Sequence, residues 1–174
     1  IVGEINIEEL PIPFTAVATD LTNQQEIWFQ EGCLHQAMRA SAAIPSLFTP
    51  VIQGKRMLVD GGLVDNLPVR EVRDHCKADV VIAVNVGSPL LKAEEVGSLL
   101  TVSAQMIGIL TEQNVQRSLA TLSPRDIYIQ PELNGISAGD FTKHVEAAAS
   151  GRKAAQAAAG KLAGLSASEA AYAA

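Results

Sequence analysis

The stretch Met57-Leu58-Val59-Asp60-Gly61-Gly62 joins a short apolar run to an acidic turn. Met57 to Val59 predict the end of a buried β-strand, which places Asp60 at the strand tip. The two glycines are expected to adopt positive φ angles and to leave the backbone bare beside the carboxylate. In α/β proteins, ligands and catalytic groups gather at such strand ends. An isolated Asp-Gly-Gly sequence is also typical of a plain turn held by its own side chain, so the flanking residues decide between the two interpretations.

Two further motifs flank this turn, Ala40 to Pro50 before it and Asn66 to Pro68 after it. Their order resembles that of the patatin-like phospholipases, a family of serine acyl hydrolases. In that family an A-S-x-A-x-P-x-x-F-x-P segment precedes a strand that ends in D-G-G or D-G-A, and N-x-P follows. The matching segments here are Ala40 to Pro50, Asp60 to Gly62 and Asn66 to Pro68. The resemblance extends from about Pro13 to about Ala163.

The resemblance implies catalysis by a Ser-Asp dyad in which Asp60 is the general base and Gly61 and Gly62 keep side chains out of the acyl pocket. The family's nucleophile lies in a G-x-S-x-G elbow, after a glycine-rich oxyanion loop, and both precede the aspartate. Neither occurs in the 59 residues before Asp60. We therefore expect the nucleophile to lie outside this chain. The chain is then the C-terminal part of a patatin-like catalytic domain, inactive by itself.

The resemblance also implies the partners of the chain. These are a lipid or acyl-ester substrate, a transient contact with a membrane surface, and the missing N-terminal part of the same domain. An incomplete domain is expected to expose an apolar face, which favours self-association. Leu63, Leu67 and Phe48 are candidates to line an acyl groove, and equally candidates for plain core.

One sequence imitates the nucleophile elbow. Gly135-Ile136-Ser137-Ala138-Gly139 satisfies G-x-S-x-G, but an elbow needs a strand running directly into the serine and a helix leaving it. The preceding strand candidate, Asp126 to Gln130, is stopped by Pro131. A loop followed by a helix that starts at Asp140 or Thr142 is therefore the preferred interpretation, and a Ser137/His144 pair is disfavoured.

Asp65 is a rival to Asp60 for the acid role, but no glycines follow it and it is expected to face solvent. The histidines, His35, His75 and His144, are not paired at metal-ligand spacing. No G-x-G-x-x-G sequence is present, which argues against nucleotide binding. We expect no cofactor and no metal.

Composition limits the function classes. A chain of 174 residues with 48% hydrophobic and 18% charged residues is typical of one globular domain. The net charge of −6 argues against a nucleic-acid surface. The apolar run Val80 to Val84 is far shorter than the roughly 20 residues that span a bilayer. Cys33 and Cys76 are too few for a disulfide framework or a zinc site.

Periodicity predicts an α/β fold, a layered α/β/α domain with a mainly parallel sheet. Ser98 to Leu122 is expected to form a long helix whose apolar stripe, including Leu99, Val102, Met106 and Val115, faces the core. Residues 79–86, apolar on both faces, are expected to form a central parallel strand. The remaining predicted strands are 14–21 and 26–30, and the remaining predicted helices are 33–43, 69–76 and 143–163.

Residues 1–165 are assigned to the catalytic-domain part, and residues 166–174 to a helical tail or the start of a linker. A narrower likeness to secreted bacterial patatin-like lipases rests on Leu99 to Leu122 and Ile136 to Phe141. It favours a secreted or outer-membrane-associated location over the cytoplasm. The alternative function is a non-catalytic α/β interaction domain that kept the scaffold, and a G-x-S-x-G elbow encoded upstream of Ile1 would distinguish the two.

Overall fold

The structure is a computed structural model that describes residues 3–137 and 139–167. The chain divides into two compact units. Unit 1 comprises Ile1–Pro68 and Leu90–Ala120, and unit 2 comprises Val69–Pro89 and Thr121–Ala174. The single domain over residues 1–165 stays a prediction. Most of the predicted tail, from residue 168 onward, lies outside the described residues.

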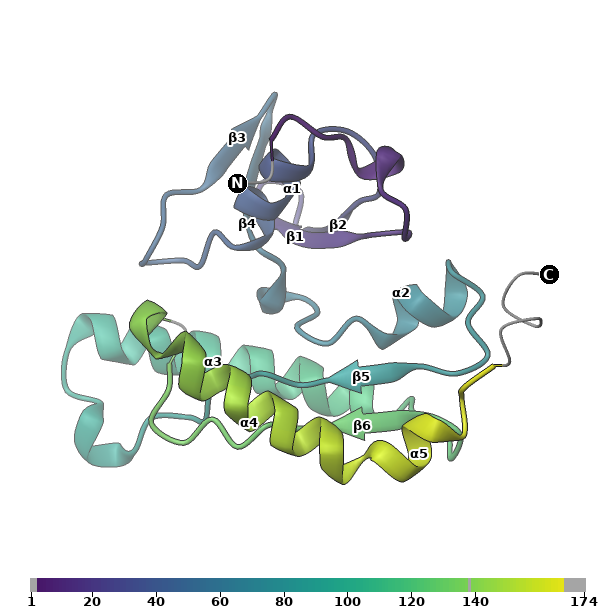
Figure 1. Ribbon diagram of the computed structural model, residues 1–174. Helices are drawn as coiled ribbons and strands as arrows, with labels where there is room; N and C mark the ends of the chain where they lie inside the picture. The colour runs from purple at the N-terminus through teal and green to yellow at the C-terminus, as the bar shows by residue number, and fades with distance from the viewer. Residues whose placement is uncertain (1–2, 138, 168–174) are drawn as a thin grey trace. The chain divides into compact units, whose positions relative to one another are not determined.

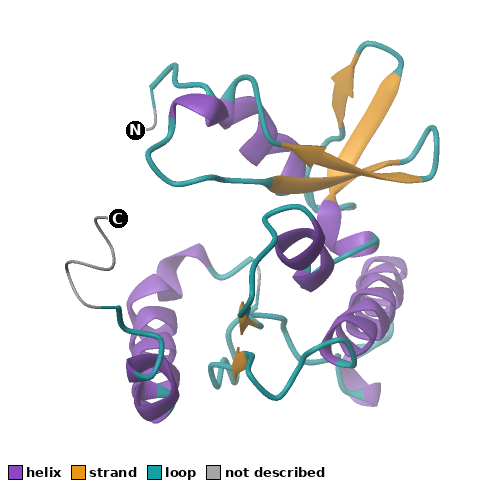
Figure 2. Ribbon diagram, turned by 90° about the vertical axis from the view of Figure 1, so that its right-hand side faces the viewer, coloured by secondary structure: helices purple, strands orange, loops and turns teal. Residues whose placement is uncertain are grey.

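Unit 1 is built on a four-stranded antiparallel sheet in the order β2-β1-β4-β3, with helix α1 packed on it (Figure 1). Figure 2 shows the twist of its strands. Ala18, Ala40 and Leu58 form a core cluster between helix and sheet, where the alanine methyl groups let the two backbones approach closely. The elements of unit 1 are η1 (Ile7–Glu9), β1 (Ala16–Asp20), β2 (Gln25–Phe29), α1 (Leu34–Ser41), β3 (Val51–Gln53), β4 (Arg56–Asp60), η2 (Gly61–Leu63), η3 (Ala93–Glu95) and α3 (Leu99–Leu119).

Unit 2 contains one parallel strand pair, in which Ile82 pairs with Ile127 and Val84 with Ile129. Its elements are α2 (Val69–Asp74), β5 (Ile82–Val84), β6 (Ile127–Ile129), η4 (Phe141–Lys143), α4 (His144–Ala157) and α5 (Ala159–Ala163). The predicted helix over residues 143–163 is thus present in two pieces.

The α/β class is confirmed, but the prediction of a mainly parallel sheet is wrong for unit 1. Short hairpins join β1 to β2 and β3 to β4 and impose antiparallel pairing within each pair, and β1 also pairs with β4 in the antiparallel sense. In the first hairpin Asp20 Oδ1 accepts a hydrogen bond from Thr22 N at 2.9 Å. In the second, Gly54 has a φ of 61°, a conformation that glycine adopts without strain. Among the described residues, parallel pairing is confirmed only for β5 and β6.

Strand β5 is less covered than its sequence predicts. Ala83 is buried, at 4% exposure, whereas Ile82 and Val84 are 48% and 47% exposed. Only three residues pair with β6, so the predicted strand over residues 79–86 is shortened. The alternating burial means that one face of β5 is open.

Helix α3 begins as predicted, with the Ser98 side chain accepting a hydrogen bond from Thr101 N at 3.1 Å. Its apolar stripe, however, is a core face only near its C-terminal end, at Val115. Leu99 is 85% exposed and Met106 62%, and the buried residues are Asn114, Val115 and Ser118. Within unit 1 the C-terminal part of α3 packs on η2, which explains why burial is confined there. No helix in the described ranges is long and apolar enough to cross a membrane.

The carboxylate of Asp126 organises the start of the parallel pair. It is buried, and it accepts hydrogen bonds from Val81 N at 2.8 Å, from Ser123 N and from the Arg73 guanidinium. Burial alone would raise the pKa of Asp126, but these donors outweigh it and lower the pKa from 3.8 to about 2.

Asp126 is therefore predicted to stabilise the fold above pH 4 and to lose that effect as the pH falls. The folded pKa lies below the unfolded one, so stability is present above about 3.9 and is lost as the pH approaches 2. In urea unfolding, Asp126→Asn should lower the midpoint at pH 7, and its difference from wild type should shrink between pH 5 and pH 2. Asp79→Asn, an exposed carboxylate in the same unit, should have little effect. An Asp126→Asn difference that is constant with pH would contradict this assignment.

Candidate active site

Two hydrogen bonds fix the backbone of Asp60, one through its N–H and one through its carbonyl oxygen. Asp60 N donates a hydrogen bond to Ala43 O at 3.0 Å, and Asp60 O accepts one from Thr19 Oγ1 at 2.9 Å. In the sheet, Asp60 is opposite Ala18 of β1. Because Ala43 lies in the segment Ala40 to Pro50, two of the motifs that are separate in the sequence meet at this residue.

The two glycines after Asp60 are required for space and not for positive φ. The prediction of positive φ was wrong, since Gly61 and Gly62 are not among the residues with that conformation and instead begin the 3-10 helix η2. A Cβ on Gly61 would overlap the carbonyl oxygen of Val17. A Cβ on Gly62 would lie 2.7 Å from Asn66 Oδ1 and 3.0 Å from Asp60 Oδ1.

The Asp60 carboxylate caps η2 and has one unused oxygen. Its Oδ1 accepts a hydrogen bond from Gly62 N at 2.7 Å. Within the described residues no donor reaches Oδ2. Burial raises the pKa of Asp60 above its usual value, and the Gly62 hydrogen bond offsets part of that rise. A half-buried carboxylate with a raised pKa and a vacant oxygen can accept a proton.

Asp60 lines a pocket of about 380 Å³ that lies within unit 1. Its apolar lining comes from Phe14, Val17, Met38 and Pro68, and its polar lining includes Ser41, Asp65 and Asn66. The apolar candidates Leu63, Leu67 and Phe48 are not among the lining residues, and Leu67 is core, at 6% exposure. Pairing of β1 with β4, rather than proximity in sequence, brings the residues before and within β1 to the acid.

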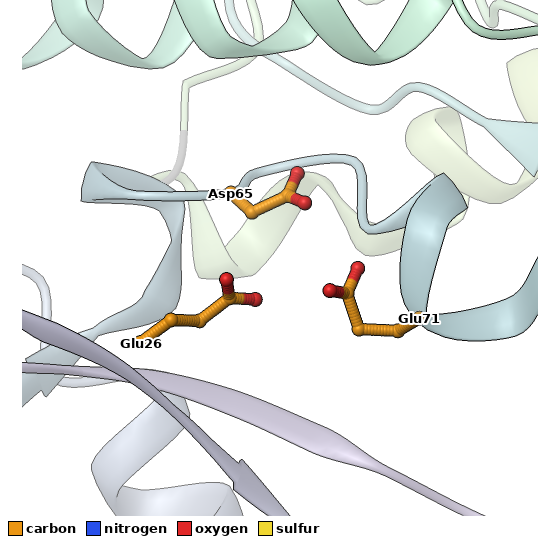
Figure 3. A group of neighbouring side chains, drawn as sticks. All are labelled: Glu26, Asp65 and Glu71. Carbon is orange, nitrogen blue, oxygen red and sulfur yellow. The ribbon is translucent and has the colours of Figure 1, made fainter. Parts of the chain in front are cut away.

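Asp65, the rival acid, is half-buried and lines the same pocket, so the expectation that it faces solvent was wrong. Its Oδ1 accepts hydrogen bonds from Leu67 N and Ser118 Oγ, both at 3.2 Å. Figure 3 shows Asp65 with Glu26 of β2, whose carboxylate lies within 4.8 Å. Glu26 accepts a hydrogen bond from Trp28 Nε1. Both carboxylates have donors within the protein, and we assign neither to a metal.

Asn114 of α3 connects to both ends of the glycine turn and was not identified from the sequence as a site residue. Its Nδ2 donates to Gly62 O at 2.8 Å, and its Oδ1 accepts from Asn66 N at 2.9 Å. It is only 3% exposed. A buried asparagine at a position that the helical periodicity assigns to the core is the one sequence signal that could have pointed to it.

The described residues of the G-x-S-x-G imitation, 135–137 and 139, lie in neither a helix nor a strand, in agreement with the predicted loop. Ser137 Oγ donates to Asp140 Oδ2 at 2.8 Å, and the helical segment begins with η4 after Asp140. The backbone and side-chain hydrogen bonds from Ser137 lower the pKa of Asp140, which makes it a poor base. His144 Nδ1 lies 3.4 Å from Phe141 O. Among the described residues no hydrogen bond joins His144 to Ser137.

The comparisons with known proteins cover the segment that contains the D-G-G turn. A model of the patatin-like phospholipase family matches residues 2–73, which include Asp60, Gly61 and Gly62. Over these residues the chain is similar to the patatin-like phospholipase family. The α/β fold of the chain is consistent with that similarity.

The relatives of this patatin-like chain are named as members of the NTE family. An uncharacterized NTE family protein of Mycobacterium tuberculosis is 49% identical over 86 residues, which cover 49% of this chain and 24% of the relative. The lysophospholipase NTE1 of Debaryomyces hansenii is 26% identical over 170 residues, 84% of this chain and 11% of the relative. That of Kluyveromyces lactis is 26% identical over 168 residues, covering 82% and 11%. The chain thus spans a quarter or less of the length of these relatives.

Because no space is left beside the Val17 carbonyl, Gly61 should tolerate substitution less well than Gly62. Gly61→Ala is predicted to destabilise the chain by about 1–3 kcal/mol or more, because a rigid backbone carbonyl must move. Gly62→Ala should cost less, since the atoms that its Cβ approaches are the ends of side chains. Urea unfolding of the two variants checks the order, and a greater loss for Gly62→Ala would contradict the packing at Val17.

Proposed function

We propose that this chain is the acid-bearing part of a serine acyl hydrolase that acts on phospholipids or related lipid esters. Asp60 is the general base of a Ser-Asp dyad. The nucleophilic serine and the oxyanion loop are supplied by residues upstream of this chain, so the chain alone does not turn over. The substrate is a lipid or acyl ester reached during transient contact with a membrane surface.

The observation that carries the proposal is the state of the Asp60 carboxylate in its pocket. A serine hydroxyl becomes a strong nucleophile only when a base takes its proton. Asp60 has a raised pKa and an oxygen without a protein donor among the described residues. Gly61 and Gly62 add no side chain to the turn after the acid, and the pocket that Asp60 lines offers the space for an incoming hydroxyl.

The lining of the pocket supports direct transfer from serine to aspartate. No histidine is among the described residues that line it, so no relay is available from this unit. Phe14, Val17, Met38 and Pro68 offer an apolar surface next to the acid. Such a surface suits an acyl chain, and it reduces the solvation of the carboxylate.

The names of the relatives support the substrate class. Two of the relatives that match more than four-fifths of this chain are named lysophospholipases. Cleavage would proceed through an acyl-serine, and water would then release the fatty acid. In the first step Asp60 takes the serine proton and passes it to the leaving alcohol oxygen as the ester C–O bond breaks. In the second step it takes a proton from water and returns it to the serine Oγ as the acyl-serine bond breaks.

In the longer protein, Asp60→Asn is predicted to lower the rate of acyl-ester hydrolysis by at least about 100-fold, because the general base is lost. Asparagine keeps an oxygen that can accept from Gly62 N, so the fold should be retained, as circular dichroism would show. Asp74→Asn, an exposed acid, is the matched control and should retain wild-type turnover. Wild-type turnover by Asp60→Asn would exclude the base assignment, whereas absence of turnover in the wild-type longer protein would favour the interaction domain.

The pH dependence of the longer protein tests the same carboxylate. Only the ionised form of Asp60 accepts a proton, so kcat/KM should fall on the acid side, with an apparent pKa above the ordinary aspartate value of about 3.9. In the residual activity of Asp60→Asn, this fall of kcat/KM at low pH should be absent. A fall that is unchanged in the variant would show that another group causes the pH dependence.

The 174-residue chain alone is predicted not to hydrolyse a short p-nitrophenyl ester above the buffer rate. Ser137 is exposed to solvent in part and bound to the weakly basic Asp140, so it cannot replace the upstream serine. In the longer protein Ser137→Ala should leave turnover unchanged. Turnover by the chain alone that disappears in Ser137→Ala would overturn the assignment of the nucleophile.

A further inference from the structure

We propose that Asn114 is a positioning residue for Asp60, because its side-chain amide holds the turn from Gly61 to Asn66 in the one arrangement that aims Gly62 N at the carboxylate. The catalytic meaning of this inference rests on the proposed function. The positioning itself is a property of unit 1 and can be measured without turnover.

Both halves of the Asn114 amide are used, and each faces the backbone group that it can bind. Nδ2 donates to Gly62 O at 2.8 Å, and Oδ1 accepts from Asn66 N at 2.9 Å. At 3% exposure no water competes readily for these groups. Asparagine is a poor helix former and a costly residue to bury without partners. Its presence on the buried face of α3 is therefore explained by the turn that it binds.

Gly62 transmits this attachment to Asp60. Its N–H donates to Asp60 Oδ1 at 2.7 Å, while its carbonyl accepts from Asn114. A glycine has wide conformational freedom, so the sequence of the turn does not by itself fix where this N–H points. The hydrogen bond from Asn114 of α3 to the Gly62 carbonyl removes that freedom.

A second residue of α3 holds the same turn farther along. Ser118, one helical turn after Asn114, donates to Asp65 Oδ1 at 3.2 Å. Asn114 and Ser118 are both buried. The C-terminal part of α3 therefore acts as a rigid support for the turn, from a position about 50 residues later in the sequence.

The chain offers a matched control on the same helix. The amide of Gln105 also makes two backbone hydrogen bonds, accepting from Leu91 N at 2.8 Å and donating to Leu91 O at 3.2 Å. Asn114→Ala and Gln105→Ala thus each remove a two-point amide contact from α3, and only the first contact reaches the Asp60 turn.

The test is the titration of the Asp60 carboxyl carbon by NMR in the 174-residue chain. Asn114→Ala should shift the Asp60 pKa upward, because the Gly62 N–H that lowers it is no longer held in place. Gln105→Ala should leave the Asp60 titration at its wild-type position. An Asn114→Ala titration that superimposes on wild type would overturn the proposal, even if the variant is less stable.

A measurement on the wild-type chain keeps the proposal testable should Asn114→Ala fail to fold. The Asn66 side chain is exposed, yet its backbone N–H should exchange with solvent slowly, since Asn114 Oδ1 accepts from it. Exchange of the Asn66 N–H at the rate of an unprotected amide would show that the contact does not hold the turn.

In the longer protein Asn114→Ala should lower kcat by up to about 100-fold with little change in KM, because misplacing a catalytic group by about 1 Å can cost that much. Absence of esterase activity in the wild-type longer protein would refute the proposed function, while the Asp60 titration would still decide the role of Asn114. Normal kcat in Asn114→Ala together with a large loss in Asp60→Asn would refute positioning and retain the base.

Discussion

The site depends on one close approach, in which the backbone at Gly61 passes the carbonyl group of Val17 with no room for a side chain. Strand β4 is paired with β1 up to Asp60 opposite Ala18. The chain that leaves β4 must therefore turn immediately beside the preceding residues of β1. Because Gly61 permits that turn, η2 can start directly after Asp60 and return Gly62 N to the carboxylate.

Three aspartates show how hydrogen-bond donors separate a reactive carboxylate from a structural one. Asp126 is buried but accepts from two backbone N–H groups and from Arg73, and its pKa is lowered to about 2. Asp140 is bound by Ser137, and its pKa is also lowered. Asp60 has a single backbone donor against its burial, and its pKa is raised. The number of donors, more than burial itself, distinguishes the candidate base.

Much of the fold could be predicted from local sequence, which also pointed to Asp60 as the candidate acid. Three local features each predict the element in which they lie. They are the apolar run before Asp60, the turn between the first two strands, and Ser98 at the start of α3. The antiparallel sheet of unit 1 was missed because its pairing follows from which strands become neighbours, although the short hairpins were visible. The apolar stripe of α3 was assigned to a core because periodicity reports a face and not what covers it.

The parts of the site that local sequence could not predict are those brought together by tertiary structure. Phe14 reaches the pocket through the pairing of β1 with β4, and Asn114 reaches Gly62 from about 50 residues away. Likewise, the sequence predicted positive φ at the two glycines, whereas the structure shows that Gly61 is needed for steric clearance at Val17.

The most direct test of the account is an experimental structure of the longer protein with a phosphonate ester bound covalently to its nucleophilic serine. The account predicts that an oxygen of the Asp60 carboxylate lies within hydrogen-bonding distance, about 2.6–3.2 Å, of the serine Oγ or of the water that would replace the leaving group. An Asp60 carboxylate directed away from that serine, with another acid in its place, would contradict the central claim.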